Sequence, residues 1–157
     1  MDKYSNIPEL TKKYHLVEFK FDTECIYDKG DLSYLLRHII EATLPELGIK
    51  IIEEISIDGA RYVATLSNGE LSIQIFADTN SDWLPDDFFQ QLASIPILFG
   101  SNKLYCSLNP LISTGLVGQD AWYFCGTEKN LKAAREDGIP IIFPGEDITE
   151  TQEFKDL

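Results

Sequence analysis

The sequence predicts a single mixed α+β domain, and three observations lead to that prediction. Residues 49–77 hold strand-like runs joined by Asp-Gly and Asn-Gly dipeptides, which favour the tight turns of antiparallel hairpins. Residues 121–143 read as apolar strand, capped helix and apolar strand, the pattern of a βαβ crossover with parallel pairing. The chain has 157 residues, 44% of them hydrophobic, which suits one domain with one core. We therefore expect one mixed sheet of about six or seven strands with about three helices.

The elements of the first half follow from local patterns. Residues 1–13 are polar and aperiodic, which favours a short N-terminal arm. Apolar and charged residues alternate over residues 14–22, the period of a half-buried strand. Asp31 is a suitable N-cap for a helix, because apolar residues then recur at helical spacing as far as Pro45.

The second half starts with the meander of residues 49–77 and a polar loop. A helix is expected from Pro85, since proline suits a first turn and the adjacent Asp86 and Asp87 complement the positive end of the helix dipole. The domain body is thus residues 14–143. The other expected segments are a strand over 103–108, a loop over 109–119, a strand over 121–125, a helix over 127–137, a strand over 139–143 and an acidic tail over 144–157.

Charge is the strongest constraint on function. The chain has 26 Asp and Glu against 13 Lys and Arg, a formal net charge of −13. No basic residue occurs between Arg61 and Lys103, so this stretch predicts an acidic face. Such a field repels nucleic acid and anionic lipid and attracts cationic proteins.

Cysteine usage and hydropathy bear on location. Cys25, Cys106 and Cys125 have no short spacing between them, which fits neither a disulfide framework nor a cysteine-based zinc site. No run approaches the roughly 18 apolar residues of a membrane span, and the first residues do not resemble a signal peptide. We expect a cytoplasmic protein with reduced thiols and no membrane association.

The acidic segment over residues 78–87 is the best candidate for a binding site. A large aromatic side chain among carboxylates suits a contact with a basic protein, because aromatic residues often anchor protein interfaces. Bacterial immunity proteins, which block cationic nuclease toxins, share this size and charge, although no motif links the chain to them. We expect neutralisation of a basic protein partner, such as a nuclease-type toxin. The expected contact residues are Asp78, Asp82, Trp83, Asp86 and Asp87.

The same loop partly matches a calcium-binding pattern. Asp78, Asn80 and Asp82 occupy the first ligand positions of that pattern. Trp83 stands where glycine is needed, and Phe89 where a glutamate closes the coordination sphere. A polar connection whose side chains cap the next helix is the alternative, and we expect no metal or other cofactor.

A small-ligand or enzymatic domain is the competing hypothesis. Cys125, Gly126 and Thr127 join a strand to a helix, and a helix N-terminus can lower a thiol pKa or hold an anion. The loop over residues 109–119 would border that site. The junction has only one of the three glycines of a dinucleotide motif, and an accessory subunit without chemistry of its own is a third possibility.

Overall fold

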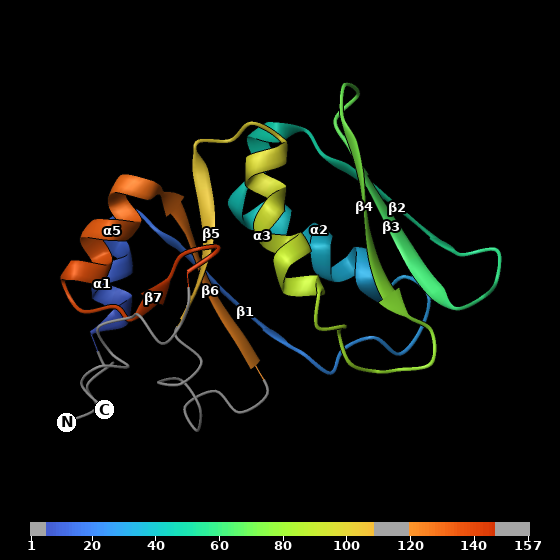
Figure 1. Cartoon of the computed structure of the whole chain (residues 1–157). Coiled ribbons are helices and arrows are strands. Elements are labelled where there is room, and N and C mark those ends of the chain that lie inside the picture. The colour runs from blue at the N-terminus through green and yellow to red at the C-terminus, as the bar shows by residue number, and fades with distance from the viewer. Residues whose placement is uncertain (1–5, 109–119, 147–157) are drawn as a thin grey trace. The chain divides into compact units, whose positions relative to one another are not determined.

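The computed structural model describes residues 6–108 and 120–146 (Figure 1). It shows helices and antiparallel sheets, so the predicted mixed α+β class is confirmed. The chain divides into two compact units. The central unit is continuous over Asp22–Phe99, and the terminal unit combines Met1–Phe21 with Gly100–Leu157.

The terminal unit contains a four-stranded sheet in the order β1-β6-β5-β7. Strand β5 pairs antiparallel with both β6 and β7. Its elements are α1 (Ile7–Lys13), β1 (Val17–Asp22), β5 (Lys103–Leu108), β6 (Asp120–Thr127), α5 (Glu128–Glu136) and β7 (Ile141–Ile142).

The predicted parallel pairing within residues 121–143 is wrong. Strands β6 and β7 run in the same direction, but β5 lies between them, and Ser107 and Leu108 of β5 pair with Ile142 and Ile141. Both residues of β7 are buried. Their apolar character therefore reflects burial. Buried strands can have antiparallel as well as parallel neighbours, so this character does not predict the direction of pairing.

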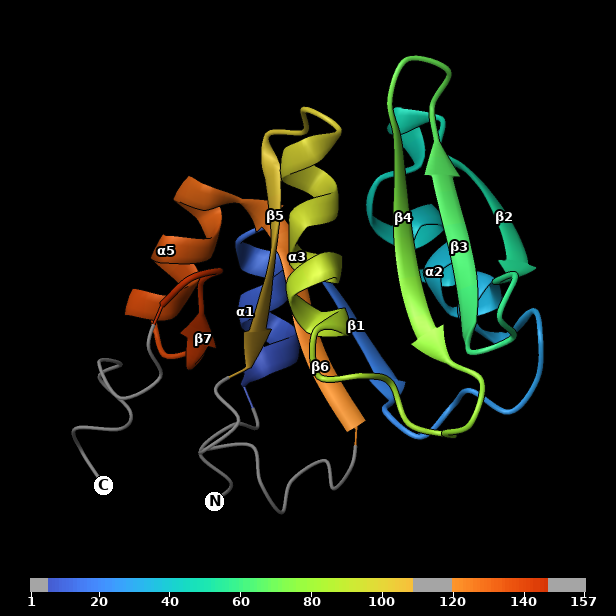
Figure 2. The same ribbon diagram turned by 45° about the vertical axis from the view of Figure 1, so that its right-hand side comes forward.

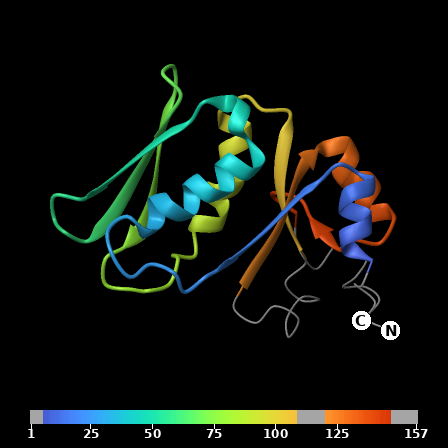
Figure 3. The same ribbon diagram turned by 180° about the vertical axis from the view of Figure 1, so that it is seen from behind.

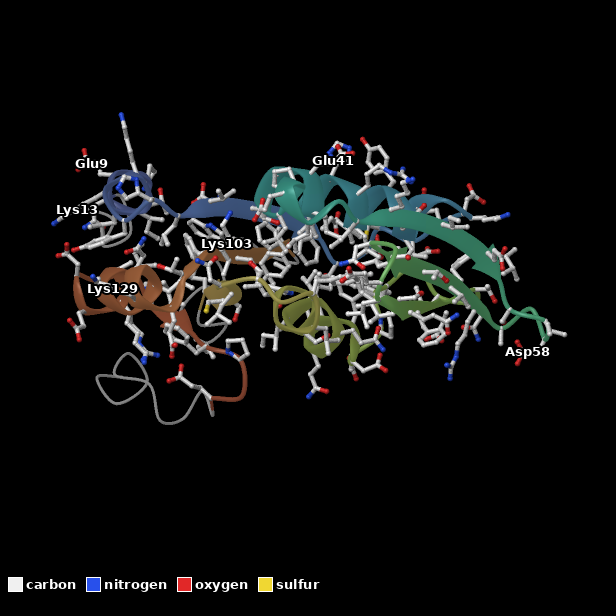
Figure 4. The ribbon with its side chains drawn as sticks, turned by 90° about the horizontal axis from the view of Figure 1, so that it is seen from above. Glu9, Lys13, Glu41, Asp58, Lys103 and Lys129 are labelled. Carbon is white, nitrogen blue, oxygen red and sulfur yellow. The ribbon has the colours of Figure 1, made fainter. Side chains whose placement is uncertain are left out.

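The N-terminal segment contains a helix where we expected an aperiodic arm. Helix α1 has Pro8 in its first turn, and its buried side chains include Ile7 and Leu10. At seven residues it spans only about two turns, too few to show a helical period in the sequence. Its last residue, Lys13, is labelled in Figure 4. Lys13 and Tyr14 join this end of α1 to the residue after α5, because both contact the carboxylate of Asp137, at 3.0 and 2.7 Å.

Helices α1 and α5 lie side by side on one face of the terminal sheet (Figures 1 and 3). At Gly126 on β6 a Cβ atom would overlap Leu16 Cδ2, so glycine permits the close approach there. The core beneath the helices consists of Ile7, Leu10, Leu16, Cys106, Leu108, Phe124, Leu131, Ala134, Ile139, Ile141 and Phe143.

The central unit contains the antiparallel meander that the Asp-Gly and Asn-Gly dipeptides predicted. The meander forms a sheet of its own, β2-β3-β4, so the expectation of one sheet for the whole chain is wrong. Helices α2 and α3 both lie on the same side of this sheet (Figures 2 and 3). The elements are α2 (Asp31–Thr43), the short 3-10 helix η1 (Pro45–Leu47), β2 (Lys50–Ile55), β3 (Arg61–Ser67), β4 (Ser72–Asp78) and α3 (Phe88–Leu98).

The start of α2 differs from the predicted cap. Gly30 is the N-cap, with a φ of 104° that favours glycine. The carboxylate of Glu53 on β2 accepts hydrogen bonds from the backbone N–H groups of Gly30 and Ser33, the latter at 2.7 Å. A strand residue distant in sequence therefore supplies the helix cap, which no local pattern reveals.

Candidate functional site

The structure exposes most of the predicted contact residues. Asp82, Trp83, Asp86 and Asp87 are all exposed in the connection between β4 and α3. Asp78 differs, because it ends β4, is half-buried and lies opposite Arg61 in the strand register. The exposed carboxylates are therefore those that follow β4.

The capping role that the sequence left open for this loop does not match its geometry. Asp87 is the N-cap of α3, yet its side chain makes no capping hydrogen bond, so its charge faces solvent. Leu84 is the buried residue of the loop, whereas Trp83 remains 46% exposed. Trp83 thus does not fold back as part of the core.

A second segment fixes the loop in place. The N–H of Ile26 donates to the carbonyl of Asp82, and the N–H of Leu84 donates to the carbonyl of Thr23, both at 2.9 Å. Between these bonds, Glu24 and Trp83 form an isolated antiparallel bridge. The bridge brings the carboxylate-bearing residues that precede α2 beside the predicted loop.

Tyr27 adds a second exposed aromatic ring to this surface. Its side chain is 57% exposed, and its hydroxyl donates to the Glu24 carbonyl at 3.1 Å. Partial burial, followed by the negative charges of Glu24 and Asp82, raises the pKa of the Tyr27 hydroxyl. Partial burial and the nearby carboxylates therefore keep the tyrosine hydroxyl protonated.

The turn that carries Tyr27 is held by Asp31. One carboxylate oxygen of Asp31 accepts from the backbone N–H groups of Tyr27 and Asp28, at 2.8 and 2.9 Å. Asp31 therefore orients the exposed tyrosine. The sequence predicted that it would cap α2, and this prediction is wrong. The charge of Asp28 remains exposed beside it.

We name the resulting patch the acidic-aromatic surface. Its centre is made by Glu24, Tyr27, Asp82 and Trp83, and Asp86 and Asp87 follow in the same loop. The sequence pointed to Asp82 and Trp83 but missed Glu24 and Tyr27, because only the backbone bridge joins the two segments.

The calcium-like spacing does not produce a metal centre in the part of the chain that the structure describes. Within residues 6–108 and 120–146, no three His, Cys, Asp or Glu side chains gather into a group able to hold a metal ion. The two departures from the pattern, at Trp83 and Phe89, remove the tight turn and the closing ligand that calcium requires.

The strand-to-helix junction of the competing hypothesis is closely packed. Cys125 is 1% exposed, and Gly126 is buried against Leu16. Thr127 caps α5 by accepting from the N–H of Asn130 at 3.2 Å. The loop over residues 109–119 lies outside the described residues.

This packing predicts unreactive thiols in the native protein. Burial raises the pKa of Cys106 to about 12, and burial together with the charges of Asp22 and Asp31 raises that of Cys25 to about 11. Because the thiolate is the nucleophile, iodoacetamide at neutral pH should modify Cys106 and Cys125 only after unfolding, and Cys25 slowly.

Mass spectrometry of peptides after timed alkylation, with and without guanidinium, measures these rates. The unfolded chain serves as the control, since all three thiols should then react alike. Rapid alkylation of Cys125 in the folded protein would contradict the packing described here.

Neither a search for membrane-spanning helices nor comparison with known proteins assigns a role to this surface. Among the described residues, no helix is both long enough and apolar enough to span a membrane. No protein-family model, no curated protein and no solved structure matches this chain.

Proposed function

We propose that the protein binds a basic protein partner and neutralises it, with the acidic-aromatic surface at the centre of the contact. The observation that supports this proposal is the exposure of Trp83 and Tyr27 among carboxylates on a backbone fixed by the Glu24–Trp83 bridge. A fixed backbone reduces the entropy lost on binding. The surface is therefore preorganised for a partner.

The chemistry of the surface fits a cationic partner. Lysine and arginine side chains form ion pairs with carboxylates and pack over aromatic rings, so both kinds of group at this site attract them. The net charge of −13 speeds association with a positively charged protein and repels nucleic acid.

The kind of partner that matches best is a nuclease-type toxin. Such a protein carries a cationic surface for nucleic acid, and an acidic protein that covers this surface blocks access to the substrate. In this role the protein acts in the cytoplasm, as bacterial immunity proteins do. It needs no catalytic residue of its own for this.

The test is affinity capture from a lysate of the native organism, with the immobilised protein washed at low and then moderate salt. We expect one basic protein in near-stoichiometric amount. Reversing the charges of Asp82, Asp86 and Asp87 to lysine should reduce its retention at least tenfold, because several close charge pairs are lost. Trp83→Ala should weaken binding by about 2 kcal/mol, the size expected for an aromatic anchor.

A matched control keeps the overall charge equal. Glu41, Glu70 and Glu136 are also exposed, and their reversal to lysine changes the net charge by the same amount as the loop variant. Equal loss of the partner from both variants would mean that bulk charge, and not this surface, drives capture. Recovery of no specific basic protein would overturn the proposal.

A further inference from the structure

Strand β2 forms an edge of the central sheet and carries exposed apolar side chains. The strand order places β2 beside β3 alone. Ile52 is 64% exposed and Ile55 is 48% exposed. An exposed apolar edge strand is a ready site for pairing with another strand.

The backbone groups that face away from β3 can be assigned from one hydrogen bond. The N–H of Ser56 donates to the carbonyl of Arg61 at 2.9 Å, and the register of β2 and β3 is regular. Because hydrogen-bonding direction alternates along a strand, the backbone of Ile52 faces β3. The N–H and C=O groups of Ile51 and Glu53 therefore point toward the free edge.

Two charged side chains flank Ile52 on the face of the sheet away from the helices. Lys50 and Glu54 are exposed, and side chains two residues apart share a face. Their opposite residues on β3 are the uncharged Ser67 and Val63. Among the residues that the structure describes, no ion pair joins either charge to another group.

We propose that β2 pairs antiparallel with β2 of a second copy of this chain, about a two-fold axis at Ile52. Lys50 then lies opposite Glu54 of the second copy, Ile52 lies opposite Ile52, and Glu54 lies opposite Lys50. The outward backbone groups of Ile51 and Glu53 pair with Glu53 and Ile51 of the second copy. The two meanders become one continuous antiparallel sheet.

Charge complementarity favours a second copy of the chain as the partner strand, and it favours this register. A two-fold interface is self-complementary, and the order Lys50, Ile52, Glu54 is complementary to its own reverse. Shifting the axis to Glu53 would place Ile52 opposite Glu54 and lose both ion pairs. A strand from another protein has no such built-in match, and it is an alternative outcome of the test.

The net charge of −13 opposes association of two copies, so the ion pairs decide the balance. Opposite charges directly across a strand pair stabilise it, and like charges destabilise it. The expected assembly is therefore a concentration-dependent dimer whose affinity depends on the signs at positions 50 and 54.

Sedimentation velocity of the full chain over about 1 µM to 1 mM measures this equilibrium. The wild type should shift from monomer to dimer. K50E places glutamates opposite each other and E54K places lysines opposite each other, so each should weaken the dimer at least about tenfold. The double variant K50E/E54K, which swaps both charges, should restore it.

An equimolar mixture of K50E and E54K gives the sharpest readout. Each variant alone has like charges across the axis, but a mixed dimer has opposite charges at both positions. The mixture should therefore dimerise where neither variant does. Near-ultraviolet circular dichroism shows whether the variants keep the native fold.

Several results would overturn the proposal. These are a wild type that stays monomeric over the whole range, a dimer that both single variants retain, and a mixture that stays monomeric while the wild type dimerises. The lysine variant at Asp82, Asp86 and Asp87 keeps the strand residues of the dimer and has a smaller net charge, so it should dimerise at least as strongly as the wild type. Failure of the partner-binding proposal can therefore be distinguished from failure of this one.

Discussion

Phe124→Ala should destabilise the protein by about 3–5 kcal/mol, the usual cost of removing a large buried aromatic ring. Phe124 is 0% exposed on β6 and belongs to the core between the terminal sheet and helices α1 and α5. The cavity would adjoin side chains from both helices. Because whole domains are stable by about 5–15 kcal/mol, this single change threatens the folded state of the terminal unit.

Urea unfolding followed by tryptophan fluorescence and circular dichroism measures the effect. Phe124→Leu is the matched control, and it should cost less because more of the buried volume is kept. A loss below about 1 kcal/mol for Phe124→Ala would contradict the described core.

Glu53→Ala should have the second-largest effect, a loss of about 2 kcal/mol. The carboxylate accepts two backbone hydrogen bonds at the start of α2, and its removal leaves both donors without that acceptor. The charge also interacts favourably with the positive end of the helix dipole. The helix should fray first at its N-terminal turn.

Glu54 offers a neighbouring control on the other face of β2. Glu54→Ala removes the same charge without a capping bond, and in solutions dilute enough to keep the chain monomeric it should change stability by less than about 0.5 kcal/mol. Hydrogen exchange should show faster exchange at Ser33 in Glu53→Ala alone. Equal destabilisation by both substitutions would show that Glu53 does not act as the cap.

Local signals in the sequence predicted most elements of the fold. The Asp-Gly and Asn-Gly turns located the β2-β3-β4 meander, and helical spacing after Asp31 located α2. These elements are specified by neighbouring residues, so one sequence is enough to predict them. Helix α1 was missed because it is short.

Pairing between distant segments was the part that the sequence did not reveal. The apolar run of β7 does not indicate which strand it pairs with. Antiparallel pairing with β5 and parallel pairing with β6 would both suit the same residues. The same limit applies to the candidate surface. Trp83 and Asp82 are visible in the sequence as an aromatic residue among carboxylates, whereas Glu24 joins them only through a bridge across the intervening α2 and meander.

The cap of α2 shows the same limit for a single side chain. Asp31 has the right chemistry and position for an N-cap, but Gly30 adopts a positive φ and occupies that position. The capping carboxylate then comes from Glu53 on a strand. A strand glutamate gives no sign in the sequence that its partner is a helix terminus.

The discontinuous build of the terminal unit determines the order in which the chain matures on the ribosome. The central unit is complete once Phe99 has emerged. The first-made segments, α1 and β1, must wait for β5, β6 and α5, which supply the core around Ile7 and Leu10. During translation, α1 and β1 are thus made before the central unit but complete their packing after it, and their apolar side chains stay exposed in the interval.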